Sequence, residues 1–320
     1  SELLYRIYQG EIEVLPEKLA FYRVRLLDFT VRDPVELSMP LAVDFGSTNT
    51  TAGIYMDDLY FVGLGIQPEQ QMRWHLNKMN HAVFYDVEQE YAETPLLPSV
   101  AALRVLNEGG EPEFIFGYEA LRELDANYAD EGFCVSFDIK SWLMKLDKKE
   151  EFVDRKGART FISRKQVLQR YFRYVIQNAE DCFKCKAKQV HISCPMKQRY
   201  LFQQLFQEVL TEYDVDAKDM LDEGVSVLYG TIDELLKKKK IHMKEKYKAL
   251  IIDCGGSTTD MTSCTFSVLN QRMSYKIDID TTYMDGDMDF GGNSITYRIM
   301  QVLKIQLFSV VEGGVERREA

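Results

Sequence analysis

Two segments of the sequence share one pattern of residues that could bind a phosphate group. Residues 41–55 and residues 249–264 each read as an apolar strand, an aspartate, a turn rich in Gly, Ser and Thr, and a second strand. Asp44 and Asp253 occupy the same place in the two segments. A carboxylate at the end of a buried strand is costly unless a cation lies beside it, and small residues after it let backbone N–H groups approach an anion. The pair of segments therefore predicts two similar hairpins that close on a nucleotide–metal complex.

Either segment alone would more often be a plain hairpin between two strands, because short motifs of this kind occur frequently by chance. The presence of two copies favours the phosphate-binding interpretation. The sequence contains no G-x-x-x-x-G-K-[ST] motif, and no strand is followed by a complete G-x-G-x-x-G motif. A P-loop and a Rossmann dinucleotide site are therefore not expected.

Composition limits the class of protein. The chain has 320 residues, of which 46% are hydrophobic and 28% are charged, as in ordinary globular proteins. Two domains of ordinary size are expected at this length. Its net charge of −11 argues against a nucleic-acid partner, which normally requires a basic surface. No run of 18 apolar residues and no secretion signal is found, so we expect a cytoplasmic protein that does not span a membrane.

The sequence contains four residues whose types would allow them to bind zinc together. Cys182, Cys185, His191 and Cys194 begin with the C-x₂-C spacing of half a zinc-binding motif. However, residues 190–194 alternate like a strand, and a strand points residues three positions apart to opposite faces. We therefore expect reduced thiols without zinc, and the zinc site is kept only as an alternative.

The periodicity of apolar residues predicts alternating helices and strands. Residues 163–166 fit a helix capping box, and apolar residues follow at helical spacing as far as Ala179. A strand is expected over residues 189–194, and a second helix over residues 201–210. This alternation predicts an α/β architecture with ligands at the carboxyl ends of strands. The lysine-rich run at residues 236–244 is expected to be a solvated surface.

The chain resembles the superfamily of actin, sugar kinases and DnaK-type chaperone ATPases, and within it the DnaK-type nucleotide-binding domain. The resemblance rests on the two phosphate turns and on the order of further segments across residues 41 to about 305. These segments are Thr94–Val100 (a Thr-Pro-Ser loop), Phe116–Ala120 (a Gly-x-x-Ala helix start), Phe137–Lys140 (Phe-Asp-x-Lys), Ser193–Pro195, Asp222–Gly224 with Tyr229–Gly230, and Asp287–Gly292 (a Leu-Gly-Gly turn).

This resemblance implies an actin-like ATPase fold, in which two ribonuclease-H-like lobes enclose a nucleotide cleft. A β-rich extension is expected over residues 1–40, a first lobe over 41–220 and a partial second lobe over 221–320. The second lobe is expected to be incomplete, because the family continues beyond the Gly291–Gly292 turn with a helical subdomain and a turn that grips adenosine.

The resemblance also implies roles for individual residues. Asp44 and Asp253 would hold Mg²⁺ through its waters, since this ion prefers one or two carboxylates with substrate phosphates. Glu223 would position the attacking water, and Asp260 would orient water or the metal. Contacts to the phosphates and the nucleotide, ATP or ADP, would come from Gly46, Ser47, Thr48, Asn49, Gly255, Gly256, Ser257, Thr258, Gly291 and Gly292.

The sequence departs from the family's pattern at the residue expected to supply a cation. Counting from Gly117 places Leu121 where the family has a lysine that contacts phosphate, so the adjacent Arg122 is the expected catalytic cation. Hydrolysis of ATP is then expected to be slow, in a chaperone-like protein that acts on a protein partner or client. Two alternatives remain, namely a non-catalytic scaffold or filament protein of the same fold and a small-molecule kinase, for which no acceptor base is recognisable.

Overall fold

The computed structural model describes residues 34–36, 39–56, 74–75, 78–86, 92–106, 112–127, 133–215, 220–271, 275–287 and 290–316. Contacts divide the chain into two units, residues 1–34 and residues 35–320, and the features below belong to the second unit. The β-forming segments expected within residues 1–40 lie almost entirely outside the described residues. Of that region, β1 (Val35–Glu36) pairs in parallel with β13 (Cys185–Lys186).

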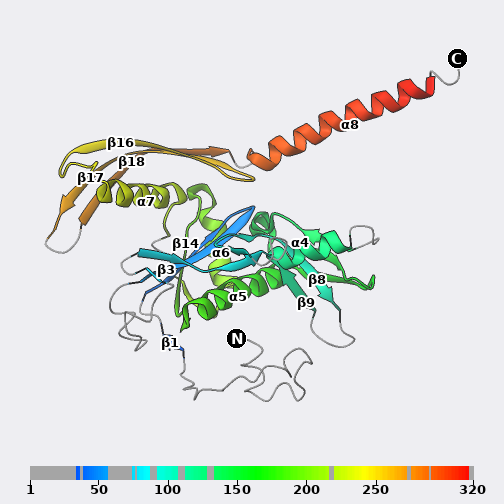
Figure 1. The fold of residues 1–320 in the computed structure, drawn as a ribbon, viewed down its shortest axis with the longest axis horizontal. Coiled ribbons are helices and arrows are strands. Elements are labelled where there is room, and N and C mark those ends of the chain that lie inside the picture. The colour runs from blue at the N-terminus through cyan, green and yellow to red at the C-terminus, as the bar shows by residue number, and fades with distance from the viewer. Residues whose placement is uncertain are drawn as a thin grey trace, which may run out of the picture. The chain divides into compact units, whose positions relative to one another are not determined.

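The first sheet, called here the large sheet, has the strand order β15-β14-β2-β3-β4 (Figure 1). Its strands are β2 (Leu41–Phe45), β3 (Asn49–Met56), β4 (Lys78–His81), β14 (Gln189–Ile192) and β15 (Asp214–Val215), and β7 (Leu97–Pro98) also pairs with β3. The consecutive strands β2, β3 and β4 are antiparallel, whereas β14 and β15 run parallel to β2. The expected strand over residues 189–194 is confirmed by β14.

Two amphipathic helices pack into the core of the large sheet. The helix α5 (Arg164–Phe183) begins with the expected capping box at Ser163 and Gln166, and its apolar stripe is buried. The helix α6 (Arg199–Glu208) buries Leu201, Phe202, Leu205 and Phe206, which confirms the second expected helix. Phe45 of β2 packs against Tyr171 and Phe172 of α5, with ring centroids 5.9 Å and 4.9 Å apart. This packing fixes the strand that carries Asp44.

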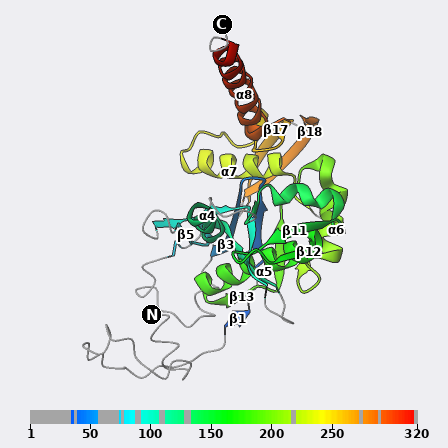
Figure 2. The same ribbon diagram turned by 90° about the vertical axis from the view of Figure 1, so that its right-hand side faces the viewer.

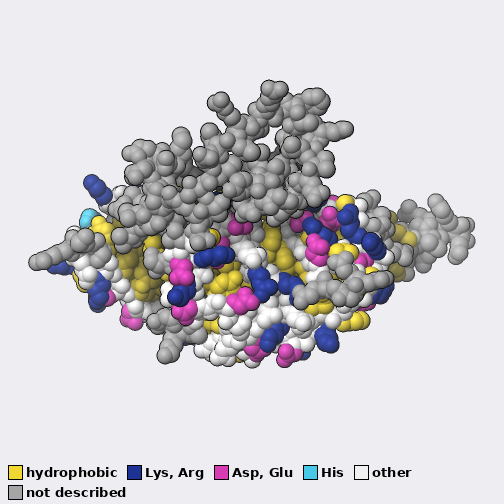
Figure 3. Space-filling view, turned by 90° about the horizontal axis from the view of Figure 1, so that it is seen from below, with side chains coloured by type: hydrophobic (Ala, Val, Ile, Leu, Met, Phe, Trp, Pro, Cys, Tyr) yellow, Lys and Arg dark blue, Asp and Glu magenta, His cyan; other side chains and the backbone are white. Residues whose placement is uncertain are grey.

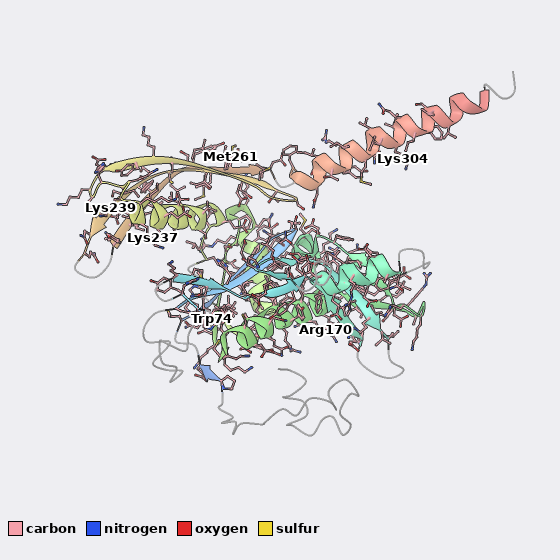
Figure 4. All side chains as sticks on the ribbon, in the orientation of Figure 1. Trp74, Arg170, Lys237, Lys239, Met261 and Lys304 are labelled. Atoms are coloured by element: carbon pink, nitrogen blue, oxygen red, sulfur yellow. The ribbon has the colours of Figure 1, made fainter. Side chains whose placement is uncertain are left out.

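A second, small sheet follows the large one along the chain. It consists of β16 (Lys246–Cys254), β17 (Thr259–Asn270) and β18 (Tyr275–Asp287), paired antiparallel in sequence order. The helix α7 (Glu223–Lys237) runs along one face of this sheet in both ribbon views (Figures 1 and 2). Its residues Leu228 and Ile232 form a separate core with Cys264, Phe266 and Val268 of β17. Met261 lies on the side of the sheet that faces away from α7 (Figure 4).

The remaining elements connect these two sheets or flank them. They are β5 (Phe84–Asp86), β6 (Ala92–Thr94), β8 (Ala101–Val105), β9 (Glu113–Phe116), α4 (Gly117–Ala126), β10 (Val135–Ser136), the 3₁₀ helix η2 (Ile139–Lys145), β11 (Lys149–Val153), β12 (Arg159–Ser163), the short η3 (Met196–Gln198) and α8 (Gly292–Glu316). The described part of the chain is thus mixed α/β, which confirms the expected fold class at this level. The expected domain boundaries remain predictions.

The surface carries charges of both signs. On the face shown in Figure 3, lysine and arginine side chains are interspersed with aspartate and glutamate. Lys237 and Lys239 lie at the end of α7 that is drawn farthest from α8 (Figure 4), and Lys237 and Lys238 pair with Asp233 and Glu234 one turn earlier. The lysine-rich run therefore lies at an exposed helix end. None of the described helices has the length and apolar character required to cross a membrane.

Candidate functional site

The loop between β2 and β3 forms a closed turn directly after Asp44. The backbone N–H of Gly46 donates a hydrogen bond to the carbonyl of Asn49 over 3.0 Å. A Cβ atom at Gly46 would collide with that carbonyl oxygen, so a larger residue would open the turn. The N–H of Ser99 also donates to the carbonyl of Thr48 over 2.8 Å, which ties the turn to the segment after β7.

A chain of buried hydroxyl groups supports this first turn from the core. Tyr171 Oη donates to Thr50 Oγ1 over 2.8 Å, and Thr50 Oγ1 lies 3.0 Å from Ser99 Oγ. Ser99 Oγ in turn donates to the carbonyl oxygen of Gly46 over 2.7 Å. Tyr171, Thr50 and Ser99 are all fully buried. The hydroxyl chain therefore links α5 and β3 to the backbone of the turn.

Removing the hydroxyl group of Tyr171, which begins this chain of hydrogen bonds, should destabilise the protein. In Tyr171→Phe, Thr50 loses its buried donor, and we expect the free energy of unfolding to fall by about 1–2 kcal/mol. Urea denaturation of the wild-type and variant proteins measures this difference. Tyr200→Phe is the matched control, because Tyr200 is 60% exposed and the same change there should have almost no effect. Equal stability of all three proteins would show that the hydroxyl chain does not support the turn.

The loop between β16 and β17 repeats the geometry of the first turn. The N–H of Gly255 donates to the carbonyl of Thr258 over 2.9 Å, so the bond spans three residues as it does in the first turn. In both turns the aspartate lies two residues before the donating glycine. The strands of the two hairpins have the same register, since each aspartate lies opposite the residue seven positions later, but that residue is Thr51 in the first hairpin and Asp260 in the second. The second turn therefore carries one carboxylate more than the first.

The start of α8 packs directly on the second turn. Gly292 and Asn293 donate their backbone N–H groups to the carbonyls of Gly255 and Gly256 over 3.0 Å and 2.8 Å. A Cβ atom at Gly291 would lie only 2.6 Å from the carbonyl carbon of Gly256, so the close approach requires glycine here. The Gly291–Gly292 pair thus adjoins the second turn, although neither residue lines the cavity described next.

The two turns face each other across a cavity of about 250 Å³, called here the carboxylate cavity. A Cβ atom at Gly256 of the second turn would collide with Thr48 Oγ1 of the first, which shows how closely the turns approach. The cavity brings together most of the residues expected at a nucleotide site. Its lining residues are Asp44, Gly46, Ser47, Thr48, Asn49, Thr51, Leu96, Lys140, Glu223, Asp253, Gly255, Gly256, Thr258 and Asp260.

Burial and neighbouring negative charge raise the proton affinity of two carboxylates in this cavity. The pKa of Asp44 is raised, first because the cavity walls desolvate the carboxyl group and also because Asp253 is near, while Lys140 opposes the shift. The pKa of Asp260 is raised by desolvation and by Asp253 as well, again opposed by Lys140. Ser193 Oγ donates to Asp44 Oδ1 over 3.4 Å. A cation between these groups would therefore relieve mutual repulsion.

Lys140 is the one cation that lines the carboxylate cavity within the described part of the chain. Its Nζ lies 3.0 Å from Glu223 Oε1, and the two side chains are only 8% and 13% exposed. Burial raises the pKa of Glu223 to about 7, while Lys140 pulls it down and Asp44 and Asp260 push it up. Lys140 Nζ also lies 5.8 Å from the centre of the Phe202 ring on α6. The lysine is therefore held in place by packing as well as by charge.

Local structure explains the positions of both partners. Lys140 is the second residue of η2, whose neighbours Ile139, Trp142 and Leu143 are buried. Glu223 is the first residue of α7, which Asp222 caps by accepting a hydrogen bond from Val225 N–H. This cap is joined to the large sheet, because Cys194, which follows β14, forms a parallel β-bridge with Asp222.

The structure does not bring Arg122 to this site. Arg122 lies on α4, is 44% exposed and approaches Glu119 and Glu123 of the same helix at 3.9 Å. Leu121 packs instead against a small cluster that includes Val100 and Ala102. The expectation that Arg122 is the catalytic cation is therefore unsupported by the geometry. Counting along a single helix missed Lys140, although Lys140 was already visible in the sequence as the lysine of the Phe-Asp-x-Lys segment.

The four candidate zinc ligands do not form a cluster. His191 is exposed on β14, whereas Cys194 and Cys185 are buried. No group of three or more His, Cys, Asp or Glu side chains with metal-binding geometry occurs within the described residues. A metal ion in the carboxylate cavity would accordingly depend on Asp44 and Asp253 together with water and phosphate oxygens. Such a ligand set suits Mg²⁺, which keeps much of its hydration shell.

The geometry of the carboxylate cavity is suited to reactions of a bound anion whose charge is balanced by neighbouring groups. Backbone turns, a buried lysine and a glutamate that titrates near neutral pH line one small cavity. No protein-family model matches this chain, and a comparison with curated proteins finds no significant relative.

Proposed function

We propose that the chain binds ATP with Mg²⁺ in the carboxylate cavity and hydrolyses it, as an actin-like ATPase of the DnaK type. The observation that carries this proposal is the pair of turns with matching hydrogen bonds, each two residues after an aspartate, that face each other beside Lys140 and Glu223. Turns of this kind present backbone donors to anions.

The order of strands in the large sheet supports the same proposal. Three consecutive antiparallel strands, β2 to β4, are followed by two strands parallel to β2 that are added beyond it. A ribonuclease-H-like lobe has this arrangement. The small sheet repeats only its three antiparallel strands, with α7 on one face.

Each polar residue of the cavity has a role in the proposed reaction. Asp44 and Asp253 would hold Mg²⁺, which supplies positive charge to the phosphates. Lys140 would stabilise the negative charge that develops on the transferred phosphoryl group, since positioning and electrostatics provide most of the catalysis in such reactions. Glu223 would accept a hydrogen bond from the attacking water, and Asp260 would orient water in the second hairpin.

The most direct test is titration of the protein with ATP in the presence and absence of Mg²⁺. Tight binding that requires the metal is expected. Sedimentation with and without ATP separates this proposal from the scaffold alternative, because a filament protein would form nucleotide-dependent polymers. A protein partner or client belongs to the same proposal, as the resemblance to the DnaK type implies.

The pKa of Glu223 predicts how hydrolysis depends on pH. The carboxyl group of Glu223 carries a proton below about pH 7 and is charged above it, whereas an ordinary glutamate is charged throughout this range. Only the charged form accepts a hydrogen bond from water through both oxygens. The single-turnover rate should therefore rise from pH 6 to pH 8, and Glu223→Gln should lower it by about 10²-fold or more and remove this rise. A pH profile that Glu223→Gln leaves unchanged in shape would contradict the assignment.

A further inference from the structure

A dense group of lysines, called here the lysine cluster, covers one end of the small sheet. The group comes from the end of α7, the loop that follows and the first half of β16 (Figure 4). Its members are Lys237, Lys238, Lys239, Lys240, Lys244, Lys246 and Lys248. All seven are exposed. Lys246 is opposite Ser267 at one end of β17, whereas Asp253 is opposite Asp260 at the other. Seven residues of one strand separate Lys246 from Asp253, so the lysine cluster lies roughly 23 Å from the carboxylate cavity.

Most of the positive charge of the lysine cluster is not compensated nearby. Only its two members at the end of α7 form ion pairs within the described part of the chain. Glu245, the one acidic residue among residues 237–248, already accepts a hydrogen bond from Tyr247 Oη over 3.0 Å. Asp278 and Asp280 of β18 lie two strands away from β16, at about 10 Å across the sheet. The lysine cluster is therefore a local excess of positive charge on a chain whose net charge is −11.

The loop that carries the lysine cluster is held in one conformation. Lys239 and Lys244 adopt left-handed backbone angles, with φ of 54° and 68°. The N–H of Lys239 donates to the carbonyl of Leu236 over 3.0 Å, and the N–H of Lys244 donates to that of Val268 over 2.9 Å. Between them, Ile241 is buried in the core of the small sheet. The charges are thus gathered on a preformed surface, and a partner does not have to order a loose tail when it binds.

The composition of the lysine cluster limits the class of partner. Residues 237–248 contain no arginine, which is the residue that recognises phosphates and nucleic acids through its planar fork. Their one aromatic residue, Tyr247, is partly buried and its Oη is hydrogen-bonded, so it offers no platform on which bases would stack. Lysine is also depleted at protein interfaces, where arginine is enriched. These features disfavour a nucleic acid and an acidic protein as the partner.

A membrane surface rich in anionic lipids fits the lysine cluster better. Lysine is a strongly hydrated point charge, and clusters of about four to eight basic residues are attracted to the diffuse negative potential of such a surface. The turn before β16 adds an apolar group, because Met243 lies beside Lys244 and is 37% exposed. We propose that the lysine cluster binds the surface of a membrane that contains anionic lipids, with Met243 at the contact. The protein then lies on the membrane without crossing it, and this binding does not require the nucleotide.

The experiment is sedimentation of the whole chain with lipid vesicles. The probes are vesicles of phosphatidylcholine alone and vesicles of equal parts phosphatidylcholine and phosphatidylglycerol. We expect binding to the mixed vesicles alone at about 0.1 M NaCl, and its loss at about 0.5 M NaCl, where the screening length falls from about 10 Å to about 4 Å. The triple variant Lys239→Gln, Lys240→Gln, Lys244→Gln should lower the partition coefficient by about 10²-fold, because each lysine near an anionic surface contributes roughly a factor of five.

The matched control is a triple variant with the same change of net charge, Lys145→Gln, Lys149→Gln, Lys156→Gln. These lysines are exposed but lie outside the lysine cluster, so binding to the mixed vesicles should be unchanged. Asp253→Asn should also bind the vesicles like the wild-type protein, which separates this test from that of the proposed function.

Several results would overturn the proposal. They are equal binding to neutral and mixed vesicles, no binding to either, and equal binding of the mixed vesicles by the wild type and the variant of the lysine cluster. A DNA duplex or poly-glutamate that binds more tightly than the mixed vesicles at the same salt concentration would assign the lysine cluster to a nucleic acid or to an acidic protein instead.

Discussion

Replacing Lys140 with methionine should lower the single-turnover rate of ATP hydrolysis by about 10²–10³-fold, the usual cost of losing one electrostatic donor to the transition state. Methionine keeps much of the packing against Phe202 but removes the charge. It also removes the ion pair that lowers the pKa of Glu223, so the remaining activity should require a higher pH. Rapid-quench measurement with labelled ATP over a range of pH tests both effects.

The matched control is Arg122→Met, which removes the cation that counting along α4 had favoured. Its side chain pairs only with glutamates of its own helix among the ion pairs of the described residues, so hydrolysis should be unchanged. A loss of activity in Arg122→Met equal to that in Lys140→Met would show that the lysine is not the essential cation. Circular dichroism must confirm that both variants are folded.

Asp253→Asn should abolish binding of ATP in the presence of Mg²⁺ while leaving the fold intact. Asparagine has nearly the same shape, but it leaves Asp44 as the only one of the two proposed metal carboxylates. Mg²⁺ prefers carboxylates and phosphate oxygens, so the metal-dependent part of the affinity should disappear. Isothermal titration calorimetry measures this change directly.

The same titration in EDTA makes the test more specific. Without the metal, Asp253 repels the phosphates, so Asp253→Asn should then bind ATP at least as well as the wild-type protein. Asp278→Asn is the control, since Asp278 lies on β18, is 48% exposed and pairs with Lys276 outside the cavity. Unchanged affinity of Asp253→Asn in the presence of Mg²⁺ would disprove the model of two hairpins around one metal ion.

The sequence was sufficient where local rules decide the structure. The capping box at Ser163, the helical spacing as far as Ala179 and the strand at residues 189–192 all depend on near neighbours, and all are found. The two glycine turns are also local features, because each needs only a tight bend after a strand. Their positions were therefore predictable from single segments.

The sequence was insufficient where the site depends on distant contacts. Lys140 and Glu223 are 83 residues apart, and nothing near either of them shows that they meet. The distance along the chain from Gly117 favoured Arg122 as the catalytic cation. However, α4 packs against β7 to β10 and does not carry Arg122 to the carboxylate cavity. The hydrogen bond from Ser257 Oγ to Asp138 joins the second hairpin to a left-handed residue before η2, so it could not be anticipated from sequence.

The parallel β-bridge between Cys194 and Asp222 places Glu223 next to the point where the chain passes from the large sheet to the small sheet. All strands of the large sheet precede α7, and all strands of the small sheet follow it, so the chain passes between the two sheets once. The bridge lies at this passage, immediately before Glu223. Because Glu223 directly follows Asp222 in the chain, a rotation of the small sheet about this β-bridge would move the backbone of Glu223 little and would largely preserve its contact with Lys140.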